Sequence, residues 1–88
     1  MTTRIVQVRN PLGLHARAAA RFVELAGRFV SQIRVTRGAK TMDGKSILGL
    51  LLLAAARGSE IAIAADGHDE VQAVRDLAAL VDRGFEDA

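Results

Sequence analysis

The chain has 88 residues, of which half are hydrophobic and a quarter are charged, and this is typical of one compact domain. It contains no cysteine, which excludes disulfide bonds and thiolate metal sites. The first segment, MTTRIVQVRN, lacks the apolar stretch of a signal peptide, and no apolar run is long enough to span a membrane. We therefore expect a single domain, residues 1–88, that is located in the cytoplasm and does not bind a membrane.

The charged residues are unevenly distributed along the chain. Up to residue 57 there are ten Lys and Arg against two acidic residues, whereas residues 58–88 contain two Arg against eight acidic residues. A basic half is compatible with nucleic acid and with acidic protein partners. Because the only aromatic residues are three Phe, a platform for stacking bases is poorly provided for, and we favour protein partners over nucleic acid.

Strand and helix patterns alternate from the start of the chain. The segment RIVQVR (residues 4–9) alternates and is rich in β-branched residues, which predicts a strand, and Pro11 and Gly13 mark the turn that follows. From Ala16 to near Gly27, apolar residues recur at steps of three and four. This spacing predicts the first helix.

The middle of the chain continues with two strands and a helix. SQIRVT (residues 31–36) alternates again, and RGAK is a plausible hairpin connection to a short strand around Thr41 and Met42. A second helix is expected to begin near Ser46 and to end near Gly58.

The last third predicts one strand and one helix. EIAIAA (residues 60–65) is the strand, and Asp69 with Gln72 three residues later has the spacing of a capping box. The apolar stripe of the final helix consists of Val71, Val74, Leu77, Ala78 and Val81. The complete order is typical of an α+β open-faced sandwich, in which three helices cover one face of a four-stranded, mostly antiparallel sheet.

The most unusual local arrangement is NPLGLHARAAAR, residues 10–21, which places a histidine and an arginine at the start of the first helix. The free N–H groups and the positive dipole of a helix start suit a phosphate group. Arg17 adds a planar fork for phosphate oxygens, and the positive field favours a neutral, nucleophilic His15. From the spacing alone, a capping histidine beside a solvated arginine is the commoner arrangement, and both interpretations stay open.

The segment GLHARAAARFV closely resembles the active-site segment of the HPr family, the histidine-containing phosphocarriers of the bacterial sugar phosphotransferase system. The resemblance covers essentially the whole chain, with a second similar segment, GKSILGLLLLAA, followed by GSEIAIAADGHDE. It implies that His15 accepts a phosphoryl group on Nδ1 from phosphorylated enzyme I and passes it to a histidine of a IIA domain. It also implies that Arg17 steadies this group together with the backbone amides of Ala16 and Arg17. Such a protein is a stoichiometric carrier rather than an enzyme and uses no cofactor.

One residue departs from the family pattern. Many members have proline immediately after the arginine, where this chain has Ala18. Proline is favoured early in a helix because its missing N–H costs nothing there, but alanine is the best helix former. We therefore expect a slightly looser helix start at most, with the chemistry retained.

Ser46 is expected at the start of the second helix, where serine is a favoured N-cap residue. In the family, the matching serine is the target of an ATP-dependent HPr kinase/phosphorylase in some bacteria. The two roles are compatible, because a helix dipole tolerates a phosphate at this end. The added charge would lie beside a partner-binding surface and could repel acidic partners.

The helix that follows, ILGLLLLAAA, is apolar around nearly its whole circumference, which is more than a small domain can bury. We expect Leu50 and Leu53 in the core. The positions expected to be partly exposed are Ile47, Leu48 and Leu51. An exposed apolar patch with a basic rim is typical of a docking site, and the resemblance places enzyme I and IIA proteins here, with Arg21 and Lys45 at the rim.

Other functions remain open from the sequence. The nitrogen-branch paralogue shares the histidine chemistry but serves a regulatory relay, and a regulatory HPr-like binding module lacks the active histidine, so His15 argues against it. A small nucleic-acid binder would use the basic half and bind with a steep salt dependence. A small hydrolase is less favoured because no water-positioning residue lies beside Arg17. His68 is interpreted as a solvated turn residue, no metal site is expected, and the protein is expected to be a monomer.

Overall fold

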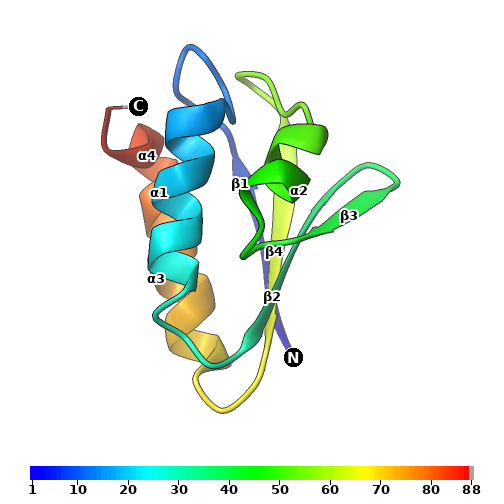
Figure 1. Ribbon diagram of the computed structural model, residues 1–88, viewed down its shortest axis with the longest axis vertical. Coiled ribbons are helices and arrows are strands. Elements are labelled where there is room, and N and C mark those ends of the chain that lie inside the picture. Colours follow the sequence, from blue (N-terminus) through cyan, green and yellow to red (C-terminus); the bar gives the residue numbers. More distant parts are fainter. Residues whose placement is uncertain (88) are drawn as a thin grey trace.

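Four strands form one antiparallel sheet in the order β1-β4-β2-β3 in the computed structural model, which describes residues 1–87 (Figure 1). The strands are β1 (Thr2–Gln7), β2 (Gln32–Arg37), β3 (Lys40–Asp43) and β4 (Glu60–Asp66). The helices are α1 (Ala16–Ala26), α2 (Ile47–Leu52), α3 (Glu70–Asp82) and the short α4 (Gly84–Asp87). Helices α1 and α3 run side by side against the sheet, and α2 packs on α1 and β3. The predicted open-faced sandwich is confirmed.

The alternation of side chains in β4 explains why one face of the sheet is covered. Ile61 and Ile63 are fully buried on the helical side, whereas Ala62 and Ala64 are only half-buried on the opposite side. Successive residues of a strand point to opposite faces, so a shift of one residue would expose both isoleucines. The core closes where these side chains meet those of the helices, including the fully buried Phe22 of α1.

The second helix is shorter than predicted, because α2 ends at Leu52 rather than near Gly58. Ala54 has a left-handed backbone (φ 50°), and the carbonyl of Ala55 accepts a hydrogen bond from the N–H of Leu14 at 2.9 Å. The alanines after α2 are good helix formers, so local propensity gives no sign of this end. The helix ends at Leu52 because the backbone after it bonds to Leu14, which is distant in sequence.

Asp69 is the N-cap residue of α3, but the predicted capping box with Gln72 is not formed. The side chain of Asp69 makes no capping bond; its carboxylate accepts hydrogen bonds from the N–H of Val30 at 2.9 Å and of Ser31 at 3.0 Å. Gln72 donates instead to Asp76, one turn further along the helix, at 2.7 Å. Asp69 therefore serves a loop that is distant in sequence, which a four-residue pattern cannot reveal.

Most of the predicted apolar stripe of α3 is buried, but Val71 is 60% exposed. Burial in this helix begins at Ala73, so the first turn, which contains Val71, lies outside the core. Leu80 is buried in addition to the predicted positions. Within the described residues, no helix is long and apolar enough to cross a membrane.

The backbone kinks after α3. Phe85 and Glu86 have left-handed backbone angles (φ 55° and 58°), and the Phe85 side chain is fully buried in the core. The guanidinium of Arg21 donates to the carbonyl oxygens of Phe85 at 3.2 Å and Glu86 at 2.7 Å. These contacts hold the last segment against α1 in a conformation that residues other than glycine rarely adopt.

Candidate functional site

His15 is the N-cap residue of α1, with an extended backbone (φ −86°, ψ −177°). Its Nδ1 accepts a hydrogen bond from the backbone N–H of Arg17 at 3.3 Å, in an exposed position. An accepting Nδ1 places the proton of the neutral ring on Nε2. Nε2 is buried and has no hydrogen-bond partner within the described residues. The geometry therefore makes Nδ1 the accessible nucleophilic nitrogen of the ring.

The loop before His15 is held in place by close backbone contacts. Gly13 has a left-handed backbone (φ 67°), and a Cβ atom on it would lie 2.5 Å from the carbonyl oxygen of Ala55. The side-chain amide of Asn10 donates to the carbonyl of Gly13 at 2.7 Å. Together with the bond from Leu14 to Ala55, these contacts fix the position of the ring at the helix start.

Arg17 lies in the first turn of α1 with an exposed side chain. Its guanidinium contacts no acidic side chain in the part of the chain that the structure describes. The first N–H groups of a helix lack partners within the helix, so the region around Nδ1 combines free donors with an unneutralised cation. Ala18 is fully buried within α1, which begins at Ala16, so the helix start is retained without proline.

Ser46 is the N-cap residue of α2, as predicted. Its Oγ accepts a hydrogen bond from the N–H of Gly49 at 2.9 Å, and the side chain is half-buried. The capping hydroxyl also leaves little space for a side chain at Gly49, because a Cβ atom there would lie 3.2 Å from this oxygen. The hydroxyl thus caps the helix end, on a residue that is only partly buried.

The apolar positions of α2 divide as predicted. Leu50 and Leu53 are fully buried, whereas Ile47 is 43% exposed, Leu48 is 67% exposed and Leu51 is half-buried. Two further exposed leucines were not predicted: Leu52 of α2 and Leu12 in the loop before His15. Both are ordinary apolar residues in sequence, so only the fold distinguishes them from core residues.

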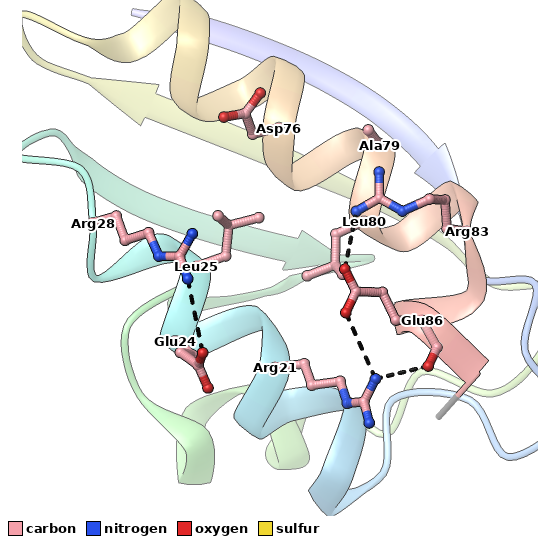
Figure 2. Close-up of a pocket in the computed structure, with 9 residues that line it drawn as sticks. All are labelled: Arg21, Glu24, Leu25, Arg28, Asp76, Ala79, Leu80, Arg83 and Glu86. Atoms are coloured by element: carbon pink, nitrogen blue, oxygen red, sulfur yellow. Dashed lines mark hydrogen bonds and ion pairs between the residues drawn. The ribbon is translucent and has the colours of Figure 1, made fainter.

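The two predicted rim residues are both engaged within the protein. The ammonium group of Lys45 donates to the carbonyl of Phe29 at 2.6 Å. Arg21 borders a cavity of about 590 Å³ between α1 and α3 and contacts Glu86 there (Figure 2). Contact with a partner at Arg21 or Lys45 remains a prediction.

His68 is exposed in the turn before α3, as predicted. Residues 1–87 contain no group of three or more His, Cys, Asp or Glu side chains that could hold a metal ion. The candidate site therefore consists of His15, Arg17 and the start of α1.

The site of this small α+β protein combines a histidine, an arginine without an acidic partner among residues 1–87 and the N-terminus of a helix, an arrangement suited to an anion such as phosphate. A family model described as "PTS HPr component phosphorylation site" matches residues 2–83. The chain therefore belongs to the HPr family of phosphocarrier proteins of the phosphotransferase system.

Relatives match along nearly the whole chain. The phosphocarrier protein HPr of Cupriavidus necator is 45% identical over 85 residues, which are 97% of this chain and 96% of the relative. The HPr-like protein Crh of Bacillus subtilis is 43% identical over 81 residues, which are 92% of this chain and 95% of the relative.

Solved structures agree with the fold. The structure of HPr-C-His from Thermoanaerobacter tengcongensis has a TM-score of 0.95 at 36% identity and covers 100% of this chain and 99% of that one. An HPr dimer from the same organism has a TM-score of 0.77 at 38% identity, with 97% and 98% covered. Since family members include a dimer, the monomeric state stays a prediction for this chain.

Proposed function

We propose that this protein is a cytoplasmic phosphocarrier that accepts a phosphoryl group on His15 from phosphorylated enzyme I and passes it to a histidine of a IIA domain. The observation that carries the proposal is the orientation of the ring, with Nδ1 accessible at the start of α1 and Nε2 buried. The Nδ1 lone pair attacks phosphorus, the N–P bond forms, and the bond between phosphorus and the donor breaks. Because the ring proton is on Nε2, no proton has to leave Nδ1 first.

In this proposal, Arg17 and the first turn of α1 stabilise the phosphoryl group on His15. When Nδ1 bonds to phosphorus, the Arg17 amide loses its acceptor and becomes free to donate to a phosphoryl oxygen. The Ala16 amide and the unpaired Arg17 guanidinium would stabilise the same charge. These groups hold the phosphoryl group without supplying a water-activating base, which fits a carrier better than a hydrolase.

The proposed docking surface for enzyme I and IIA domains consists of Ile47, Leu48 and Leu51, with Arg21 and Lys45 at its rim. Its support is the exposure of Ile47 and Leu48 and the partial exposure of Leu51, in a helix whose other face is buried. Exposed apolar residues in a small protein are typical of an interaction site.

Ser46 is proposed as a site of regulatory phosphorylation by an HPr kinase/phosphorylase. A phosphate on Oγ would keep acceptor oxygens near the N–H of Gly49, so the cap of α2 would be retained. The new negative charge would adjoin Ile47 and Leu48 and weaken docking of acidic partners. The nitrogen-branch relay is the alternative that would use the same His15 chemistry with other partners.

The direct test combines the protein with phosphoenolpyruvate and a catalytic amount of enzyme I from the same organism. We expect intact-mass analysis to find one acid-labile phosphoryl group per chain, and none on a His15→Ala variant. An unmodified wild-type chain beside a competent enzyme I would contradict the proposal. The sugar and nitrogen branches are then separated by offering the loaded protein to IIA domains of each branch.

A further inference from the structure

A groove of about 440 Å³ lies between β1 and α3. Residues 4–7 of β1 and Arg9 line one side, and Arg75 and Asp82 of α3 line the other. Strand β1 is one edge of the sheet and β3 is the other. Because α2 packs on α1 and β3, the groove is on a different side of the protein from the proposed docking surface for enzyme I.

The backbone of β1 is unpaired along this groove. The strand pairs with β4 alone, and within the described residues its backbone makes no hydrogen bond to any other segment. In an edge strand, about half of the N–H and C=O groups point away from the sheet, and they can pair with another extended chain. The Thr2 hydroxyl bonds to Glu70 at 2.6 Å and Arg9 pairs with Asp82 at 2.9 Å, so β1 is fastened to α3 at both ends.

The charge of the groove is not neutralised by the protein itself. Neither Arg4 nor Arg75 has an ion pair or hydrogen bond to its side chain within residues 1–87, and Asp82 is the one acidic residue of the lining. The cavity between α1 and α3 differs, because its arginines are paired with acidic side chains (Figure 2). Of these two depressions, only the β1–α3 groove leaves arginines free for a ligand.

We propose that this groove binds an acidic segment of a partner protein, which adds to the β1 edge as an extended strand. The alternating donors and acceptors of β1 match a peptide backbone, and acidic side chains of the added strand would meet Arg4 and Arg75. Residues 4–7 extend over roughly 10 Å of strand and residues 75–82 over roughly 10 Å of helix, which fits three to four residues of the partner.

Two other occupants fit less well. The β1 strand of a second copy would bring its own Arg4 and Arg9 to a groove that is already positive, and like charges repel. A nucleic acid would satisfy the arginines but would leave the outward carbonyl groups of β1 facing phosphate oxygens. The acidic strand satisfies both the charges and the backbone.

The test is a titration followed by amide chemical shifts of the labelled full-length protein. The probe is an acetylated hexapeptide of alternating Glu and Val, compared with the same peptide N-methylated at alternate amides. We expect shifts confined to residues 2–9 and 75–82, and loss of binding on N-methylation, because methylation removes the backbone donors while keeping the charges. Absence of binding, or equal binding of the methylated peptide, would overturn strand addition.

Two matched variants test the role of charge. Arg4→Gln with Arg75→Gln is expected to weaken hexapeptide binding roughly fivefold or more, since two exposed ion pairs are lost. Arg28→Gln with Arg34→Gln removes the same charge outside the groove and should change binding by less than about twofold. An equal effect of both double variants would overturn the proposal. Tighter binding of oligothymidylate than of the peptide at the same amides would also overturn it, in favour of a nucleic acid. Shifts of β1 amides that depend on protein concentration in the absence of peptide would overturn it in favour of a second copy of the chain.

Discussion

The Ser31 hydroxyl donates a hydrogen bond of 2.5 Å to the carboxylate of Asp69 and joins the loop before β2 to the start of α3. Ser31 is almost completely buried, and the carboxylate also accepts the N–H groups of Val30 and Ser31. Gly67 packs directly on this pair, because a Cβ atom there would lie 2.6 Å from the Ser31 hydroxyl. The Asp69 carboxylate thus holds the loop before β2 against the start of α3.

Removal of the Ser31 hydroxyl should destabilise the fold. Ser31→Ala is expected to lower the free energy of unfolding by about 1–3 kcal/mol, since a hydrogen bond to a charged acceptor is lost from a buried site. Urea denaturation measures the change. Ser59→Ala is the matched control, because that serine makes no side-chain hydrogen bond in the described chain. Equal stability of the two variants would contradict this account of Asp69.

The Thr2–Glu70 contact predicts acid sensitivity. The Thr2 hydroxyl, followed by the N-terminal amine, lowers the pKa of Glu70 from 4.5 to about 2. Because the folded-state pKa is below that of the unfolded chain, this stabilisation is present above pH 4.5 and is lost as the pH falls towards 2. Thr2→Val should raise the pKa of Glu70 in an NMR titration, whereas Thr3→Val, one residue along, should not.

The close approach at Gly13 should be essential for the position of His15. Gly13→Ala must displace the backbone of Ala55 and also place an alanine in a left-handed conformation. Gly38→Ala has the left-handed conformation alone, which costs about 1–2 kcal/mol, because no atom of residues 1–87 lies close to its Cβ position. We expect Gly13→Ala to be the less stable variant in urea and the only one with slower phosphoryl transfer from enzyme I. Equal transfer rates in both would show that the contact does not position the ring.

Capping and charge at Ser46 can be separated by substitution. Asp and Asn cap helices about as well as Ser, so Ser46→Asp and Ser46→Asn should both unfold within about 0.5 kcal/mol of the wild type. Only Ser46→Asp adds negative charge, and we expect it alone to raise the apparent KM of enzyme I for the carrier. Ser46→Ala should cost about 1 kcal/mol of stability without this kinetic effect.

The elements with local signals could be predicted from the sequence. His15 at the start of α1 follows from a turn, a break in alternation and a run of helix formers, and Ser46 follows from its place before an apolar helix. Two of the departures from the prediction have a common physical cause. The end of α2 depends on the bond from Leu14 to Ala55, and the role of Asp69 depends on Ser31; both partners are remote in sequence.

The same limit applies to the surface. Leu50 and Leu48 have the same side chain, and only the packing of α2 decides that the first is buried and the second exposed. Gly84 marks the end of α3 with a left-handed backbone (φ 68°), but the left-handed angles continue through Phe85 and Glu86, where the residue types give no sign of them. The unpaired edge of β1 likewise follows from strand order, which alternation within one strand does not determine.

The backbone amide of Arg17 donates to the Nδ1 lone pair of His15, which is the same lone pair that a group bonding to Nδ1 would use. A group that attaches to Nδ1 must separate the two, and its departure allows them to rejoin. Under the proposed function, the amide proton of Arg17 would report whether Nδ1 carries a phosphoryl group. Fraying of the first turn of α1 would then change how readily His15 releases that group, even where no atom of the ring is altered.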